Sequence, residues 1–200
     1  PGVAGDPSRW AALSVFRSIE VGLKYIFGSS EILGRTFAVK GVGKVGLELC
    51  RLLFAKGGRL FITDTNPRAL KNAKQLFPGA SIVLPEDIHK QPVDVYAPCA
   101  LGGELGKKTI SQLRCKIVCG SANNQLVSAE AGLQLYKKKI LYIPDFVANA
   151  GGLINVKAEL HRLGYDRKRV EKKIEKVCNT VRQIIQLSRP KSLSRFIILL

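Results

Sequence analysis

The sequence predicts an α/β fold of the doubly wound type, in which helices cover both faces of a mostly parallel sheet. Short apolar runs alternate along the chain with segments whose apolar residues recur at helical spacing. Strands separated by helices favour a parallel sheet, because each crossover helix returns the chain to the same edge. Residues 36–64 also contain a strand, a glycine-rich turn, a helix and a second strand that ends on an acid.

The elements follow from their apolar patterns. A first helix is predicted at about residues 10–27, where apolar side chains keep a 3.6-residue period. Strands are predicted from short apolar runs at residues 36–40, 59–63, 81–84, 93–97, 116–119 and 140–143. The helices between them are predicted at residues 44–55, 67–77, 107–113 and 128–137. Two further helices, at about residues 153–163 and 167–187, complete the chain, and the second has one apolar stripe that needs a partner surface.

The first strand, turn and helix have the pattern that binds a dinucleotide. Gly41 permits a tight turn, Gly43 lets the backbone approach a pyrophosphate, and Gly46 lets the helix pack closely on the sheet. The helix N-terminus offers N–H groups and a positive dipole end to phosphates. A glycine pattern alone is weak evidence, and the flanking strands and helix favour binding over a purely structural turn. We therefore expect a Rossmann-type domain over residues 1–152, followed by a helical segment over residues 153–200.

The acid after the second strand predicts which dinucleotide is bound. Asp64 can accept hydrogen bonds from both ribose hydroxyls of NAD and would repel the 2′-phosphate of NADP. Arg68, four residues later, is the one candidate partner for such a phosphate. We interpret it as a solvated residue in the first turn of the next helix. The expected cofactor is therefore NAD.

Three small-residue loops follow predicted strands, at residues 97–103, 120–125 and 144–152. Ligands of open α/β sheets bind at the carboxyl ends of the strands, so these loops are candidates for a cleft. Asn123 and Asn149 lie in two of them, and neutral amides can bond a carboxamide or a ribose without adding charge. The alternative is that the loops are ordinary turns that cap helices.

Composition excludes several other classes of protein. A hydrophobic content of 46% and a charged content of 24% are ordinary for a globular chain, and no apolar run is long enough to span a membrane. The five cysteines are not at zinc-finger spacing from either histidine, so we expect buried thiols in a reducing cytoplasm and no metal site. The chain contains no Met and starts at Pro1, which leads us to expect an internal piece of a longer protein.

The formal net charge of +17 is the one unusual property of the composition. Such a charge is compatible with nucleic-acid binding. However, the cations are spread along the chain, and neither an aromatic-rich RNA motif nor a recognition helix accompanies them. We attribute the charge to attraction for nucleotide phosphates and to a generally basic surface, and we do not expect a nucleic-acid partner. A basic nucleic-acid-binding Rossmann protein is the alternative.

Six segments together resemble the motifs of the amino-acid dehydrogenases that act on glutamate, leucine, phenylalanine and valine, and most of all those of leucine dehydrogenase and its relatives. The segments occur in the same order as in that family and lie at residues 5–8, 15–17, 41–46, 97–103, 120–126 and 144–156. Their joint occurrence is highly specific. The likeness covers about residues 1–188, and the sequence from Arg189 onward departs from it.

The resemblance implies an NAD-dependent oxidative deaminase of an aliphatic L-amino acid, which forms a 2-oxo acid and ammonia. Such enzymes have two domains, and this chain corresponds to the second, which binds NAD. The first domain carries a catalytic Lys in a Gly-rich segment and a separate catalytic Asp. Neither motif has a match here, so the catalytic residues are expected outside this chain. The resemblance also implies a small-molecule substrate, a homo-oligomeric full-length parent and a cytoplasmic location.

The resemblance also assigns residues to the ligand. Those that hold the adenosine and the pyrophosphate are Gly41, Val42, Gly43 and Asp64. Those that flank the nicotinamide ribose are Ala100, Leu101 and Asn123. Asn149 is assigned to the nicotinamide and substrate end. Val156 stands where glutamate dehydrogenases have a Ser that contacts the distal carboxylate, which implies an aliphatic substrate.

One position departs from the family pattern. Ala11 replaces a Thr whose hydroxyl is expected to bond the nicotinamide carboxamide. Loss of that hydrogen bond costs about 1–2 kcal/mol of cofactor positioning. A non-catalytic NAD-binding or regulatory module that has lost its catalytic domain is therefore the alternative function.

Overall fold

The computed structural model describes residues 5–161 and 164–187, and its centre is a sheet of six parallel strands in the order β3-β2-β1-β4-β5-β6. The strands are β1 (Thr36–Lys40), β2 (Arg59–Thr63), β3 (Ser81–Ile82), β4 (Val95–Pro98), β5 (Ile117–Val118) and β6 (Leu141–Tyr142). The strand order reverses between β1 and β4, as it does in dinucleotide-binding sheets. The predicted fold class is confirmed.

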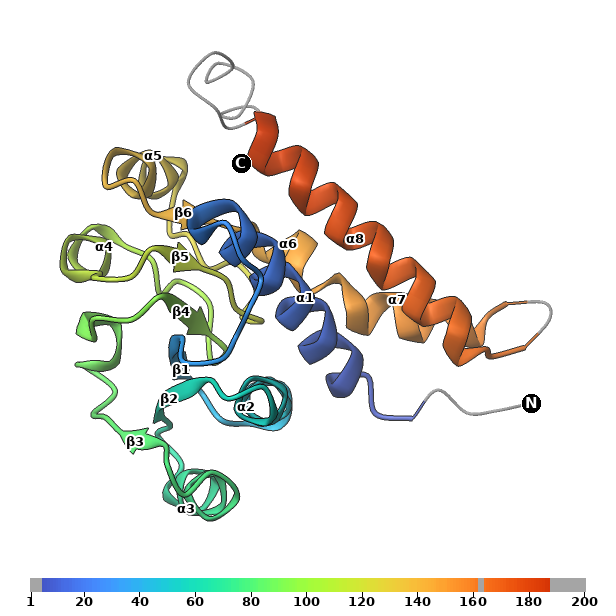
Figure 1. Cartoon of the computed structure of the whole chain (residues 1–200), viewed down its shortest axis with the longest axis horizontal. Coiled ribbons are helices and arrows are strands. Elements are labelled where there is room, and N and C mark those ends of the chain that lie inside the picture. Colours follow the sequence, from blue (N-terminus) through green and yellow to red (C-terminus); the bar gives the residue numbers. More distant parts are fainter. Residues whose placement is uncertain (1–4, 162–163, 188–200) are drawn as a thin grey trace.

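Helices cover both faces of the sheet (Figure 1). They are α1 (Ser8–Phe27), α2 (Lys44–Ala55), α3 (Pro67–Leu76), α4 (Lys107–Gln112), α5 (Ala129–Lys137), α6 (Asp145–Ala148), α7 (Ala150–Glu159) and α8 (Arg167–Leu187), together with the short 3-10 helix η1 (Ile88–Lys90). In Figure 1, α4 and α5 lie on one side of the strands, and α1, α2 and α8 lie on the other. Within the described ranges, no helix is long and apolar enough to cross a membrane.

The two faces of the central strand enter two separate cores. Phe37 and Val39 point into the core formed with α1, α2 and α8, whereas Ala38 points into the core formed with η1, α4 and α5. All three side chains are fully buried. Burial on both faces explains why β1 is a continuous apolar run rather than an alternating one.

The C-terminal helices pack on α1. The backbones of α1 and α7 meet at Gly151, where an added Cβ would lie 2.1 Å from the Trp10 carbonyl oxygen. Val177 and Val181 of α8 belong to the same core as β1. The predicted domain boundary after residue 152 falls inside α7, and the division into two units stays a prediction.

Several predicted bounds agree with the structure and others differ. Residues 36–40, 44–55, 59–63 and 167–187 form the predicted elements. The strands β3, β5 and β6 have two residues each, which is shorter than predicted. β3 lies at the edge of the sheet and pairs with β2 alone, through Ser81 and Ile82, and the Val83 amide beyond it still donates to the Ile62 carbonyl over 3.0 Å.

One predicted loop is helical. Residues 144–152 were expected to form a loop, with a helix from about residue 153, but they form α6 and the first residues of α7, which ends at Glu159. Two adjacent glycines disfavour a helix locally. Here the lack of a side chain at Gly151 allows α7 to pack against α1, and this tertiary contact favours the helix.

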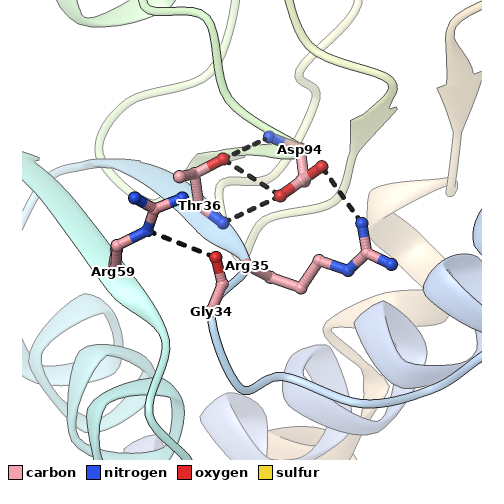
Figure 2. Close-up of polar contacts among 5 residues, drawn as sticks. All are labelled: Gly34, Arg35, Thr36, Arg59 and Asp94. Carbon is pink, nitrogen blue, oxygen red and sulfur yellow. Dashed lines mark hydrogen bonds and ion pairs between the residues drawn. The ribbon is translucent and has the colours of Figure 1, made fainter.

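The amino-terminal edge of the sheet is held by a polar cluster around Asp94 (Figure 2). The amide and the hydroxyl of Thr36 donate to Asp94 Oδ2 over 2.9 and 3.0 Å, and the Arg35 guanidinium lies 3.5 Å from Oδ1. The Arg59 Nε–H donates to the Gly34 carbonyl over 3.2 Å. These contacts join the starts of β1, β2 and β4, so the register of the sheet is set at the edge opposite the glycine-rich turn.

Candidate cofactor-binding site

The turn after β1 depends on two glycines, because other backbone atoms lie where a side chain would begin. Gly41 has φ +95°, and an added Cβ would lie 2.9 Å from the amide nitrogen of Ala100. A Cβ on Gly46 would lie 2.0 Å from the Gly41 carbonyl oxygen. Gly46 was expected to pack the helix on the sheet. In the structure it packs the first turn of α2 on the turn itself, and its nearest side chain is Cys99 of the loop after β4.

Gly43 lies immediately before α2 and faces open space. No heavy atom lies within 4 Å of the position that a Cβ would take, and its φ of −69° is open to any residue. The first N–H groups of α2 have no partner within the helix, and they lie at its positive dipole end. The absence of a side chain next to these donors fits the close approach of a pyrophosphate. The residues present therefore fit a dinucleotide.

Asp64 holds the glycine-rich turn. Its Oδ2 accepts the Val42 amide over 2.8 Å, and its Oδ1 accepts the Asn66 amide over 2.8 Å. Each carboxylate oxygen has a second lone pair, so both remain able to accept a ribose hydroxyl. The side chain of Asn66 caps α3 by accepting the Arg68 amide, which places Arg68 exposed in the first turn of that helix, as predicted.

A second part of the site brings Asn123 and Asn149 together. Asn149 follows α6 and donates its amide Nδ2 to Asn123 Oδ1 over 3.0 Å and to the Ser121 carbonyl over 2.9 Å. The predicted loops after β5 and β6 are therefore in direct contact. Both amide hydrogens of Asn149 are used in this contact, which leaves its Oδ1 as an acceptor and Asn123 Nδ2 as a donor.

The buried carboxylate of Asp145 fixes the loop that carries Asn123. It accepts the Asn124 amide over 2.7 Å and the Tyr142 hydroxyl over 2.6 Å. Burial, together with the hydrogen bond to this carboxylate, raises the pKa of Tyr142. Asn124 has φ +52°, a left-handed conformation that Asn tolerates better than most residues. The Asp145 carboxylate thus holds the position of its neighbour Asn123.

Asn123 and Asn149 line a cleft of about 440 Å³ between α1, α2 and α7. Its other lining residues are Pro7, Ser8, Ala11, Val45, Phe146, Ala150, Gly152, Leu153 and Val156. The structure therefore brings together four positions that the sequence marked: Ala11, Asn123, Asn149 and Val156. Phe146, Leu153 and Val156 form an apolar wall, with 63%, 73% and 46% of their surface exposed.

Other predicted residues lie away from this cleft. Ala100 packs against Gly41, while Leu101 is 86% exposed on the loop after β4. Asp64 and Val42 are at the end of β2 and in the glycine-rich turn. None of these four lines the cleft. The candidate site is therefore extended along the carboxyl edge of the sheet, with the glycine-rich turn at its centre, as the length of a dinucleotide requires.

Phe146 and Leu153 were not predicted as residues of the cleft. Phe146 lies in the segment that was expected to be a loop, so no helical face was considered there, and Leu153 lies at the start of the helix predicted at about residues 153–163. The spacing of three residues between Leu153 and Val156 was the available signal, since residues at i and i+3 share a face of a helix.

A partly buried polar network next to the turn was also missed. The Lys40 ammonium donates to both carboxylate oxygens of Glu104, over 2.9 and 2.7 Å, and the Tyr96 hydroxyl donates to Oε1 over 2.8 Å. Burial and the neighbouring Glu104 raise the pKa of Tyr96 well above its ordinary value. The network ties the segment that contains Ala100 to β1 and β4.

The cysteines are free thiols. Cys50, Cys115, Cys119 and Cys178 are buried, and Cys99 is partly buried in the loop after β4. Burial raises the pKa of all five, which disfavours the reactive thiolate. Their role in the structure is therefore packing.

Comparison with known proteins places this geometry in a family. Residues 60–193 match the model of the glutamate/leucine/phenylalanine/valine dehydrogenases. The chain is 40% identical to leucine dehydrogenase of Bacillus cereus over 196 residues, which are 98% of this chain and 53% of that protein. It is 42% identical to leucine dehydrogenase of Bacillus subtilis over 188 residues, 94% of this chain and 51% of that protein. The chain thus spans about half the length of these relatives.

Solved structures agree with the sequence matches. The crystal structure of L-tryptophan dehydrogenase from Nostoc punctiforme matches with a TM-score of 0.90 and 38% identity, over 96% of this chain and 60% of that one. A hetero-hexameric glutamate dehydrogenase from Thermus thermophilus matches with a TM-score of 0.71 at 20% identity, which shows a shared fold alone. The family model covers well over half of the chain, and the parallel sheet and glycine-rich turn agree with it. The chain belongs to the glutamate/leucine/phenylalanine/valine dehydrogenase family.

Proposed function

We propose that this chain is the NAD-binding part of a dehydrogenase that oxidatively deaminates an aliphatic L-amino acid to a 2-oxo acid and ammonia. The observation that carries the proposal is the arrangement along the carboxyl edge of the sheet. The open N-terminus of α2 at Gly43 lies between Asp64 on one side and the bonded pair Asn123–Asn149 on the other. This arrangement supports a long ligand with a diol at one end and polar amide partners at the other.

The glycine-rich turn and Asp64 would hold the adenosine and pyrophosphate. Asp64 is oriented by two backbone amides, so its carboxylate is positioned before any ligand arrives. A 2′-phosphate next to this carboxylate would be repelled and would also displace a hydroxyl donor. We therefore propose NAD rather than NADP as the cofactor.

NAD would supply the hydride acceptor, and the residues of this chain would orient the reacting groups. Asn149 offers Oδ1 as an acceptor in the cleft, and Asn123 offers Nδ2 as a donor. The contact between the two amides prevents either one from rotating without loss of a hydrogen bond. The pair is therefore suited to fix the orientation of a polar group that enters the cleft.

The apolar wall of the cleft supports an amino acid with an aliphatic side chain as the substrate. Phe146, Leu153 and Val156 offer no partner for a charged side chain. The side-chain carboxylate of glutamate, placed against them, would lose its hydration without compensation. A branched aliphatic side chain has little favourable hydration to lose. We propose leucine, valine or isoleucine as substrate, rather than glutamate.

The acid–base groups would come from the remainder of the parent protein, and the active parent would be a cytoplasmic homo-oligomer. General acid–base catalysis contributes about 10²–10⁴-fold to rate, and positioning of the substrate contributes more. The 200-residue chain alone should therefore bind NAD without deaminating any aliphatic amino acid. Formation of NADH from leucine by the purified chain would contradict this assignment and would require a base within it.

Calorimetric titration of the chain with NAD and with NADP tests the cofactor assignment. We expect tighter binding of NAD, and a smaller difference between the two cofactors in Asp64→Ala. Because both cofactors contact the glycine-rich turn in the same way, any effect of the substitution on the turn cancels in the ratio. NADP binding that equals or exceeds NAD binding would refute the assignment and would direct attention to Arg68.

Turnover of leucine and of glutamate by the full-length parent tests the substrate class. We expect faster turnover of leucine, and Val156→Ser should lower it because a hydroxyl then faces the aliphatic side chain. Faster turnover of glutamate by the unaltered parent would show that the substrate assignment is wrong.

One observation favours a second function, a non-catalytic NAD-binding module. Ala11 lines the cleft beside Asn123 and Asn149, so the hydroxyl expected there by resemblance is missing from the candidate site itself. A full-length parent that binds NAD but forms no NADH from any amino acid would favour the module over the enzyme.

A further inference from the structure

Residues 105–143 carry a strong excess of positive charge. They include seven cationic side chains and one acid, Glu130. The cations are Lys107, Lys108, Arg114, Lys116, Lys137, Lys138 and Lys139. Among the residues that the structure describes, none of the seven takes part in an ion pair. Glu130 lies in the first turn of α5, at the end of that helix opposite Lys137.

The fold gathers five of these cations at one end of the molecule. The Lys138 ammonium donates to the carbonyls of Ile110, Ser111 and Leu113 over 2.9, 2.8 and 3.1 Å, which ties the end of α5 to the end of α4. The Leu141 amide donates to the Lys116 carbonyl over 2.9 Å, which joins the starts of β5 and β6. The basic end surface consists of Arg114, Lys116, Lys137, Lys138 and Lys139, all of them exposed.

Local stability accounts for only one of the five. A cation near a helix C-terminus interacts favourably with the last carbonyls, and Lys138 does this for α4. The others add like charge to the same exposed end of the molecule, which is unfavourable without an opposite charge nearby. Attraction for a cofactor does not explain them either. They lie where helices end and strands begin, at the edge opposite the glycine-rich turn.

Apolar side chains lie next to these charges. On α5, Leu133 and Tyr136 are 36% and 37% exposed, and Leu133 shares a helix face with both Tyr136 and Lys137. Because Lys137 belongs to the basic end surface, this face of α5 adjoins that surface. The helices α4 and α5 lie side by side (Figure 1). A phosphate backbone gains nothing from an exposed leucine. An acidic peptide with an apolar side chain would match both features.

We propose that the basic end surface, with Leu133 and Tyr136, binds an acidic polypeptide segment that carries at least one apolar side chain. The carboxylates pair with Arg114, Lys116, Lys137 and Lys139, and the apolar side chain packs on α5. The inference does not depend on the proposed dehydrogenase function, because the two surfaces lie at opposite edges of the sheet.

Fluorescence anisotropy with synthetic peptides tests the proposal. The probe is a labelled peptide that alternates glutamate with leucine, added to the 200-residue chain at moderate salt. The triple variant Arg114→Gln, Lys116→Gln, Lys137→Gln removes charge from the surface. It leaves Lys138, which caps α4, and Lys139, which has φ +57°. We expect binding about tenfold weaker, the equivalent of about 1.4 kcal/mol.

A matched control removes the same charge from another exposed surface. The variant Lys168→Gln, Lys172→Gln, Lys176→Gln alters three exposed residues of α8, and we expect it to change affinity by less than about twofold. Equal loss in both triple variants would overturn the proposal, because binding would then follow net charge alone. If the first triple variant fails to fold, the single variants Lys137→Gln and Leu133→Ser should each still weaken binding.

Two further probes separate the partner classes. A peptide that alternates glutamate with serine has the same charge and should bind more weakly than the leucine peptide. Equal binding of the two would refute the apolar contact. An oligothymidylate of equal charge should also bind more weakly. Tighter binding of the oligothymidylate would identify a nucleic-acid surface and overturn the proposal.

Discussion

The Asp64 carboxylate accepts a 2.8 Å hydrogen bond from the Val42 amide, so the acid at the end of β2 holds the glycine-rich turn at the end of β1. Val42 is 2% exposed, and its amide would be poorly hydrated without this partner. The same carboxylate is the proposed ribose acceptor. Cofactor preference and the shape of the turn therefore depend on one side chain.

Substitution of Asp64 should separate these two roles. Asp64→Ala leaves the Val42 and Asn66 amides without their acceptor, so we expect about 1–3 kcal/mol less free energy of unfolding. Asp64→Asn keeps one acceptor oxygen and should lose clearly less. Urea denaturation of both variants provides the measurement. Unfolding free energies for both variants that match the unaltered chain would show that the carboxylate does not hold the turn.

Gly43 and Gly46 should respond differently to the same methyl group. In Gly46→Ala the new Cβ meets the Gly41 carbonyl oxygen at 2.0 Å, and backbone atoms cannot move aside cheaply, so we expect about 3 kcal/mol of destabilisation. In Gly43→Ala the methyl enters open space, and stability should change by about 0.5 kcal/mol or less.

A side chain at Gly43 should weaken NAD binding, although it should hardly change stability. Its added methyl would occupy space proposed for the pyrophosphate, so Gly43→Ala should bind NAD about tenfold more weakly while remaining folded. Thermal unfolding combined with calorimetric titration checks both effects in one set of samples. Unchanged NAD affinity in folded Gly43→Ala would place the pyrophosphate elsewhere.

Restoring a hydroxyl at position 11 should improve cofactor binding. Ala11 lines the cleft beside Asn149, and a Thr hydroxyl there would add a hydrogen bond worth about 1–2 kcal/mol, or about 5- to 30-fold in NAD affinity. Ala11→Val has nearly the same shape without the hydroxyl and is the matched control. An equal gain in NAD affinity in both variants would show that the gain comes from packing and not from the hydrogen bond.

Stability should fall at alkaline pH because of the buried thiols. Burial raises the pKa of Cys115 to about 12 and also raises the pKa of Cys50 and Cys119. Above the ordinary thiol pKa of about 8.5, the unfolded chain releases protons that the folded chain retains, so unfolding becomes easier as pH rises. Below that pH the contribution to stability is complete.

Each such thiol should contribute a slope of about 1.4 kcal/mol per pH unit between its unfolded and folded pKa. Urea denaturation from neutral pH to about pH 10.5 covers the lower part of this range, which begins at the ordinary thiol pKa of about 8.5. The slope should be smaller in Cys50→Ala, because one thiol no longer titrates, whatever the cost of the cavity at neutral pH. A free energy of unfolding that stays constant over the range would contradict the assignment of these thiols as buried.

Sequence periodicity predicted the elements that rest on local patterns. The prediction of the strand at residues 36–40 was correct because a strand that is buried on both faces has a continuous run of apolar residues. The prediction of the helix at residues 44–55 was correct because a helix that is buried along one stripe has apolar residues at helical spacing. The long helix α8 was correct for the same reason. The lengths of β3, β5 and β6 were overestimated, since hydrogen-bond partners on neighbouring strands set the length of a strand.

A helix was predicted from about residue 153, but the start of α7 at Ala150 could not be predicted from the local sequence. Gly151 and Gly152 disfavour a helix locally, and only the contact of Gly151 with the Trp10 carbonyl on α1 makes the lack of a side chain at Gly151 an advantage. As a result, Leu153 and Phe146 were missed as residues of the cleft. Their exposure depends on how α6 and α7 sit against α1.

The sequence by itself determined the parallel α/β sheet, the glycine-rich turn and the acid at the end of β2, because each is encoded within a short stretch of residues. Only the tertiary structure decided that Asn149 bonds Asn123, that Lys40 and Tyr96 share Glu104, and that Arg114 lies near Lys138. Except for Tyr96 and Glu104, these partners are far apart in sequence. They meet because parallel strands bring the loops and helices that follow them to the same edge, and no local pattern records which side chains will then face one another.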